Sequence, residues 1–172
     1  MNLRLPLLTG CVFAGIFFGQ NLELQSQIQL EIQAESVIDF SSDRSSFTLN
    51  FSHFRSGSLT DAVSVNYSVV ANDVARTDHV VLARLDDLFP GITFEAEFGA
   101  YVKRGGNAHL VASQSGWVSV TQQDTGLADK VIDEGEGKML DGTFGITYQA
   151  KAIEDLEAGQ HLRTLTVTFT DV

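Results

Sequence analysis

The sequence predicts an all-β protein with an antiparallel two-sheet β-sandwich of immunoglobulin-like type. Short runs of alternating apolar and polar residues recur along most of its 172 residues, and turn residues separate them. Because successive side chains of a strand point to opposite faces, each run predicts a strand with one buried face. The composition agrees, since the chain has 12 Phe, only 2 Pro and no convincing amphipathic helix. Strands at this spacing are typical of two packed sheets.

Residues 1–20 have the pattern of a signal peptide. One positive residue, Arg4, precedes an acid-free apolar stretch that is too short to cross a bilayer as a transmembrane helix. We therefore expect export to the periplasm, the cell surface or the extracellular medium. Residues 21–172 would form a single β-sandwich domain without a transmembrane helix.

The one cysteine leaves two interpretations of this leader open. Residues 8–11, Leu-Thr-Gly-Cys, resemble a bacterial lipobox, which would place a lipid anchor on Cys11. The strongly apolar residues 12–18 that follow favour a cleaved signal peptide instead. In that case the mature domain has no cysteine, cannot form a disulfide and depends on its core for stability.

The longest regular alternation lies in residues 21–34, directly after the predicted signal peptide. Glutamine and glutamate fill the odd positions from 23 to 33. The even positions are apolar except for Ser26, with large side chains at Leu22, Leu24, Ile28, Leu30 and Ile32. The run predicts an amphipathic strand, which is either the first strand of its own sheet or a donor strand for another molecule.

Further strands are expected from the same alternation or from short apolar runs. They cover residues 47–51, 63–69, 79–85, 92–102, 108–112, 116–121, 144–152 and 165–169. Gly105-Gly106, between two apolar runs, predicts a hairpin. Residues 122–141 are the least regular segment, with a short apolar run at 127–132. We expect nine or ten strands in all, without an internal repeat or linker.

Charge excludes two classes of partner. The formal net charge is -11, from 22 acidic residues against 11 Lys and Arg. Nucleic acids and anionic lipids both need a basic face on the protein. We therefore expect no nucleic-acid partner.

No pattern in the chain predicts catalysis. Residues 124–126 spell the Asp-Thr-Gly triplet of aspartic proteases, but that site needs two such loops and a second is missing from the sequence. We interpret the triplet as a turn. A zinc site needs clustered ligands, whereas the histidines are scattered, at His53, His79, His109 and His161. We predict that the protein is not an enzyme and has no catalytic or metal-binding residues.

Two groups of residues have a binding interpretation. The densest acidic group could supply the oxygen ligands of Ca²⁺ or form a solvated loop, and it comprises Asp129, Asp133, Glu134, Glu136 and Asp141. Aromatic residues could form a platform for a sugar or belong to the core, and they are Trp117, Tyr101 and Tyr148.

The last quarter of the chain resembles the C-terminal part of chaperone–usher-type fimbrial subunits. The resemblance rests on Tyr148 with Ala150 and Ala152, on Gly159, and on the alternating apolar residues of 165–169. It implies an incomplete immunoglobulin-like sandwich whose groove is filled by the N-terminal extension of the next subunit. The implied assembly interface is Leu22, Leu24, Ile28, Leu30, Ile32, Leu165, Val167 and Phe169.

Two functions follow as expectations. The first is an exported, non-enzymatic structural or surface-assembly subunit of pilin-like type, which associates with itself by strand addition or with another surface protein. The alternative is a module that binds carbohydrate or another cell-surface ligand. No cofactor is expected for either function, with Ca²⁺ as the one candidate.

Overall fold

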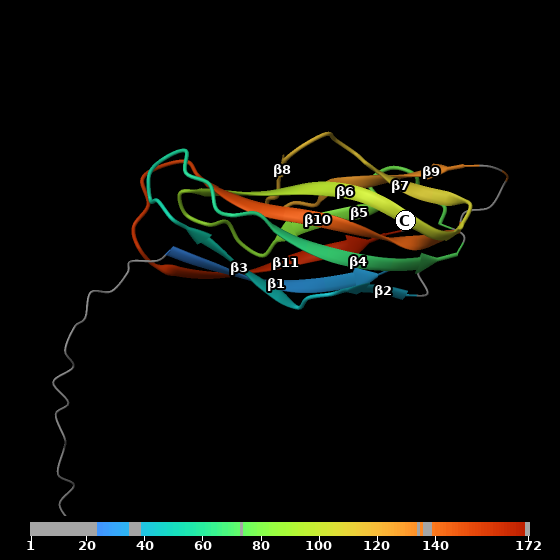
Figure 1. The fold of residues 1–172 in the computed structure, drawn as a ribbon, viewed down its shortest axis with the longest axis horizontal. Helices are drawn as coiled ribbons and strands as arrows, with labels where there is room; N and C mark the ends of the chain where they lie inside the picture. The colour runs from blue at the N-terminus through green and yellow to red at the C-terminus, as the bar shows by residue number, and fades with distance from the viewer. Residues whose placement is uncertain (1–23, 35–38, 73, 134, 136–138, 171–172) are drawn as a thin grey trace, which may run out of the picture.

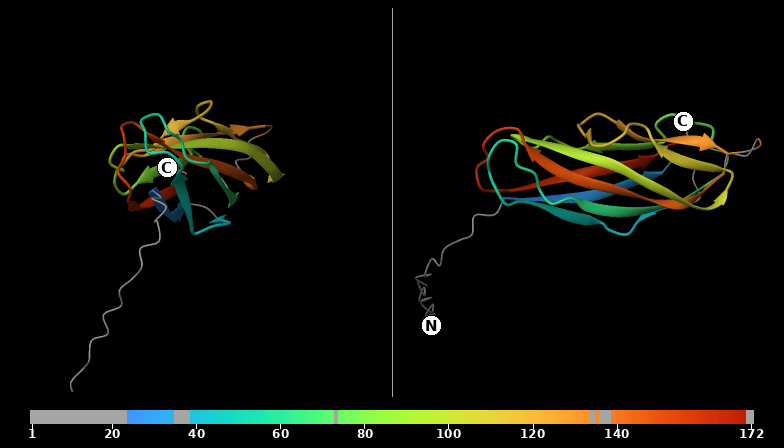
Figure 2. Two further views of the ribbon diagram at one scale, coloured as in Figure 1. Left: turned by 60° about the vertical axis from the view of Figure 1, so that its left-hand side comes forward. Right: turned by 45° about the horizontal axis from the view of Figure 1, so that its top comes forward.

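The computed structural model describes residues 24–34, 39–72, 74–133, 135 and 139–170, and these residues form an all-β sandwich of two facing sheets. The strands run along the long axis of the molecule (Figures 1 and 2). The predicted fold class is confirmed. The described residues contain eleven strands, more than the seven to nine of immunoglobulin domains. No helix in the described part is long and apolar enough to cross a membrane.

One sheet has six strands, in the order β3-β1-β11-β5-β9-β7. Their bounds are β3 Ser46–Phe51, β1 Leu24–Ala34, β11 Gln160–Phe169, β5 Val81–Leu85, β9 Thr125–Ile132 and β7 Ala108–Ala112. Neighbours are antiparallel except β1 and β11, which are parallel. The first and last described strands therefore lie side by side and run in the same direction.

The other sheet has five strands, in the order β2-β4-β10-β6-β8, and is antiparallel throughout. Their bounds are β2 Asp39–Ser42, β4 Val63–Ala71, β10 Leu140–Ala152, β6 Ile92–Gly106 and β8 Val118–Ser119. In β10 the burial alternates from Leu140 almost to the end of the strand. This period of two is what a strand with one face on a core should show.

Aromatic side chains fill much of the space between the sheets. Phe144 lies at the centre of one cluster, with ring centroids 5.1 Å from Phe98, 5.4 Å from Tyr67 and 6.3 Å from Phe40. The hydroxyl groups of Tyr67 and Tyr148 are buried and lie 2.7 Å apart, so each satisfies the other. Burial raises the pKa of both tyrosines.

Three expectations about individual elements are corrected. The chain does not form a hairpin at Gly105-Gly106, because β6 and β7 belong to different sheets and the chain crosses between them at this point. Gly106 takes the left-handed backbone conformation there, with φ +79°. The supposedly irregular segment contains the eight-residue strand β9, whereas residues 116–121 contribute only the two residues of β8. Strand β2 was not predicted.

We call one end of the sandwich proximal and the other end distal. The proximal end is where β1 begins, together with the loops at 52–62, 86–91 and 153–159 (Figure 1, left). The distal end is where β1 and β11 end, together with the crossing from β6 to β7 (Figure 1, right).

Candidate functional site

Strand β1 occupies the position between β3 and β11. Its backbone pairs in parallel with β11, from Gln25 opposite Gln160 to Ala34 opposite Phe169. On its other side it pairs antiparallel with β3, where Ile28 lies opposite Phe47. The N-terminal alternating run is therefore a strand of its own chain's sheet in this structure.

The apolar face of β1 points into the core. Ile28 and Leu30 are buried. The three β11 residues of the same predicted assembly interface are buried too, namely Leu165, Val167 and Phe169. The structure thus brings these five predicted interface residues together inside one molecule. Leu22 lies outside the described residues. Leu24 and Ile32 belong to β1, but their side chains are outside the described part.

Strand β3 depends on β1 for its place in the sheet. Among the described strands it pairs with β1 alone, at the edge of the sheet. Its inward residue Phe47 stacks on Tyr148 of the opposite sheet, with ring centroids 5.0 Å apart. Without β1, a strand-wide slot would separate β3 from β11, walled by buried side chains such as Phe47 and Leu165. A second strand of the same alternation could fill this slot through backbone hydrogen bonds.

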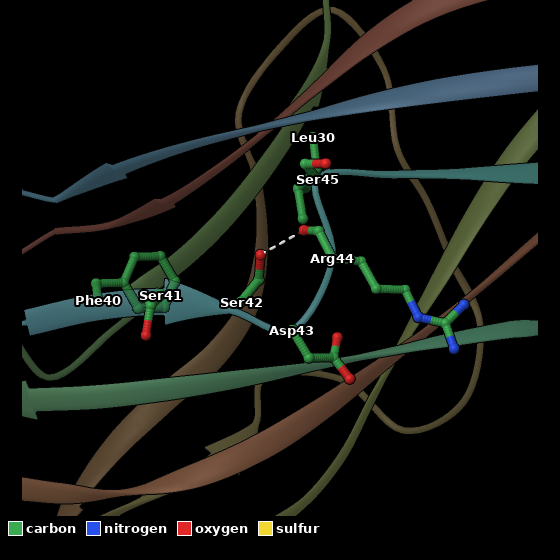
Figure 3. A pocket seen from close by; sticks show the side chains of 7 residues that line it. All are labelled: Leu30, Phe40, Ser41, Ser42, Asp43, Arg44 and Ser45. Atoms are coloured by element: carbon green, nitrogen blue, oxygen red, sulfur yellow. Dashed lines mark hydrogen bonds between the residues drawn. The ribbon is translucent and has the colours of Figure 1, made fainter.

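A shallow hollow adjoins β1 at the turn from β2 to β3. Its volume is about 460 Å³, and Figure 3 shows its lining of Leu30 and residues 40–45. Two of its side chains are engaged with the protein. Ser42 Oγ donates to the carbonyl of Arg44 at 2.6 Å. Asp43 accepts from the backbone N–H and side-chain amide of Asn66 at 3.0 and 2.8 Å.

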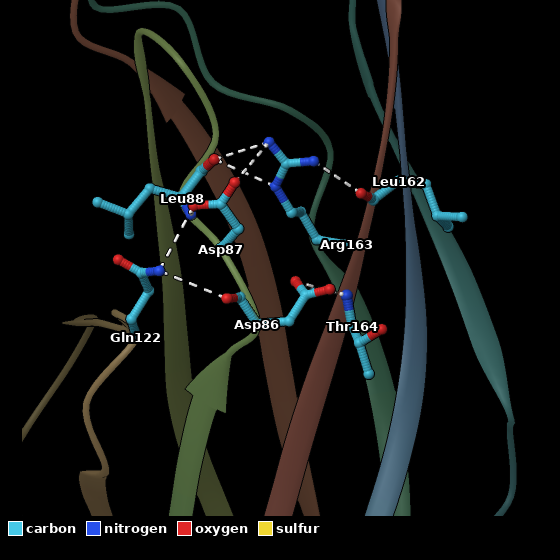
Figure 4. A network of polar contacts seen from close by, with 7 residues as sticks. All are labelled: Asp86, Asp87, Leu88, Gln122, Leu162, Arg163 and Thr164. Carbon is cyan, nitrogen blue, oxygen red and sulfur yellow. Dashed lines mark hydrogen bonds and ion pairs between the residues drawn. The ribbon is translucent and has the colours of Figure 1, made fainter.

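Arg163 has a structural role that the sequence did not indicate. It interrupts the apolar alternation of β11, and its guanidinium donates through Nε and Nη2 to the carbonyl of Leu88 at 3.1 and 2.9 Å. The same group lies 5.3 Å from the ring centroid of Phe89 and 3.6 Å from the carboxylate of Asp87. Figure 4 shows how this network ties the loop after β5 to the start of β11.

The three aromatic residues of the predicted sugar platform do not share a surface. Tyr148 is wholly buried, and Trp117 is a partly exposed loop residue next to β8. Tyr101 is the partner of Phe144 in the register of β6 and β10, and its side chain covers Gly142, where an added Cβ would overlap its ring. Burial, followed by the negative charge of Asp141, raises the pKa of Tyr101 to about 12. Trp117 is the most exposed of the three, Tyr101 is partly exposed and Tyr148 is buried.

The carboxylates of the predicted calcium group are held by separate partners. Asp129 accepts from Ser113 Oγ at 2.6 Å, and Asp133 accepts from Lys103 Nζ at 2.6 Å. Asp141 lies 3.0 Å from the Arg104 guanidinium. Glu134 and Glu136 lie outside the described residues. Within the described part, no three His, Cys, Asp or Glu side chains are placed to hold a metal ion.

A serine, a histidine and an aspartate do meet on the outer face of β7 and β9, which the sequence did not predict. His79 Nδ1 lies 3.2 Å from Ser113 Oγ and 3.4 Å from Asp129 Oδ1. His79 adopts φ 52°, and its ring lies over Gly126, where an added Cβ would overlap it. A hydrolytic triad needs serine and aspartate on opposite nitrogens of the imidazole. Here both contact Nδ1, and the serine donates to the aspartate, so the group is not arranged as such a triad.

A second polar group lies at the distal end of the same strands. Asp133, just after β9, also contacts His109 Nδ1. Lys103 comes from β6 of the other sheet, so the ion pair between Lys103 and Asp133 links the two sheets where the chain crosses between them. Both polar groups are explained as supports of the edge strand β7 and its neighbour β9.

These two aspartates are expected to make stability fall at acidic pH. Burial acts to raise the pKa of Asp129, but hydrogen bonds from Ser113 and from the His79 N–H outweigh it and lower the pKa. Hydrogen bonding from Lys103 lowers the pKa of Asp133. Because the pKa of each aspartate is lower in the folded than in the unfolded protein, the ionised carboxylate stabilises the fold. This stabilisation is fully present above the unfolded pKa of about 3.9 and is lost as the pH falls through the folded pKa.

The test is the melting temperature as a function of pH. From about pH 7 to about pH 3, the melting temperature should fall further for the unmodified protein than for the double variant Asp129→Asn/Asp133→Asn, because the variant has already lost both charges. Asp61→Asn, at an exposed position, should leave the pH dependence unchanged. An equal loss in the double variant and in the unmodified protein would contradict this account.

Comparison of the sequence with known protein families and with curated proteins finds no match.

Proposed function

We propose that the protein is a non-enzymatic subunit of an exported assembly in which β1 of one copy completes the sandwich of another. The supporting observation is the position of β1. It is the N-terminal described strand, it lies between two strands of the same sheet, and β3 reaches the rest of the sheet through it. A strand in this position can leave and be replaced without rearranging the order of the remaining strands.

Exchange of β1 between two copies conserves its contacts. Ile28 and Leu30 are buried in the slot, and burying a large apolar side chain contributes roughly 1.5–3 kcal/mol. The same contacts form whether β1 comes from its own chain or from another, so protein concentration decides between the two.

A thiol pair across β1 and β3 tests the exchange. Gln27 and Thr48 are exposed partners in the β1–β3 register, and paired residues in antiparallel strands lie within the Cα separation that a disulfide spans. Chains with Cys11→Ser would carry either Gln27→Cys or Thr48→Cys. After mixing and mild oxidation, a disulfide-linked heterodimer should form, because only an exchanged β1 places the two thiols side by side.

The matched control replaces Thr48→Cys by Ser115→Cys, an exposed position in the loop between β7 and β8. Random collisions would link this thiol to Gln27→Cys as often as they link the thiol at position 48. A heterodimer yield no higher than that of the control, at every protein concentration tested, would contradict the proposed function.

A further inference from the structure

The direction of β1 restricts how two copies that exchange this strand can contact each other. The inference drawn from it rests on the proposed function. In its slot β1 runs parallel to β11, from the proximal end to the distal end. An exchanged β1 that keeps the register and hydrogen bonds of the structure therefore leaves the acceptor at the acceptor's distal end.

The connection from β1 to β2 is short. Four residues separate Ala34 from Asp39, so the two Cα atoms can be at most about 18 Å apart at ~3.3–3.6 Å per residue. Asp39 begins β2 at the distal end of its own sandwich, since it pairs with Val70, and Val70 in turn pairs with Asp141. The donor's distal end must therefore lie next to the acceptor's distal end.

Exposed apolar side chains are present at this end. We define the distal rim as Val131, Ile132 and Met139, which remain 39%, 40% and 37% exposed. Val131 and Ile132 end β9, and Met139 directly precedes β10. A contact between two distal ends would cover these side chains, which a single copy leaves in water.

We infer that the partner of this surface is a second copy of the chain, and that reciprocal exchange of β1 produces a closed two-fold dimer joined at the distal rims. Each copy fills the slot of the other, and both connections cross the same contact. An interface of this kind is isologous and leaves no unfilled slot to continue a chain. A head-to-tail fibre would instead require β1 to enter the slot antiparallel to β11.

The double variant Gln27→Cys/Thr48→Cys, in the Cys11→Ser background, distinguishes these arrangements. The protein is unfolded, refolded at about 1 mM, in the range of the effective concentration of a tethered strand, oxidised and run on a denaturing, non-reducing gel. A chain that keeps its own β1 gives a monomer band. Reciprocal exchange closes two disulfides between two chains and should give a dimer as the largest product.

Two further variants test the contact itself. Ile132→Lys places a charge on the distal rim, and Ile153→Lys is a matched change at the proximal end, where Ile153 is 62% exposed. Both positions are exposed, so both variants should fold. Ile132→Lys is expected to lower the dimer yield about tenfold, equivalent to ~1.4 kcal/mol, and Ile153→Lys is expected to leave it unchanged.

Each other outcome has a defined meaning. A ladder of bands above the dimer, or a product lost in Ile153→Lys and retained in Ile132→Lys, would overturn the two-fold arrangement and leave the proposed exchange standing. A dimer equally abundant in both lysine variants would overturn the distal contact. Monomer alone, together with no heterodimer in the mixing experiment, would overturn the exchange and the inference together.

Discussion

A chain that lacks residues 21–34 should fail to fold, and a synthetic peptide of residues 21–34 added in trans should restore its fold. Loss of the strand removes the buried side chains of Ile28 and Leu30, each worth roughly 1.5–3 kcal/mol. It also leaves β3 without a described partner strand. A domain of this size has a total stability of only about 5–15 kcal/mol, so these losses together should remove the cooperative unfolding transition. Thermal unfolding followed by circular dichroism measures the effect.

Two altered peptides provide the control. A peptide with Ile28→Asp and Leu30→Asp carries charges on the inward face and should not restore folding, because buried unpaired carboxylates are strongly unfavourable. A peptide with Gln27→Asp and Gln29→Asp carries the same charges on the exposed face and should still restore it. Cooperative folding of the truncated chain without any peptide would refute the dependence on β1.

Phe144→Ala should destabilise the protein by about 3–5 kcal/mol, the usual cost of removing a large aromatic side chain from a core. Phe144 is 3% exposed, and its ring packs against those of Phe98, Tyr67 and Phe40. No polar group replaces the lost volume, so the variant leaves a cavity with aromatic walls. The free energy of unfolding from guanidinium titration measures the loss.

The neighbouring residue supplies the control for this substitution. Thr143 points away from the core on the same strand, and Thr143→Ala should change the free energy of unfolding by no more than about 0.5 kcal/mol. A loss below about 1 kcal/mol in Phe144→Ala would show that the aromatic cluster does not hold the two sheets together.

Local alternation predicted most strands because it depends only on which face of each strand is buried. It failed for β9, where Lys130 occupies an inward position that an apolar residue would normally take. Lys130 is 4% exposed, and its ammonium group donates to the carbonyl of Val74. Because Lys130 is polar, the sequence of β9 does not show the apolar–polar alternation of a strand. The hairpin predicted at Gly105-Gly106 was also wrong, because glycine permits a turn but does not determine whether the chain returns to the same sheet.

The inward faces of β1 and β11 were predictable from sequence for the same reason. The alternation predicts one apolar face on each strand, and Ile28, Leu30, Leu165, Val167 and Phe169 are buried. The parallel direction of the two strands was not predictable, because residues 25 and 160 are paired only by the complete fold. His79 and Asp129 were unpredictable as well, because the left-handed conformation of His79 and the space above Gly126 bring them together.

The adjacency of β1 and β11 also determines when folding can finish during synthesis. Ribosomes make β1 first and β11 last among the described strands, so β1 cannot find its parallel neighbour until nearly the whole domain has been translated. Such non-local pairing slows folding and leaves strand edges uncovered in the meantime. Strand β3 can pair with β1 early, but the other edge of β1 stays uncovered throughout that interval. Chaperones or other copies of the chain can bind this edge before β11 has been made.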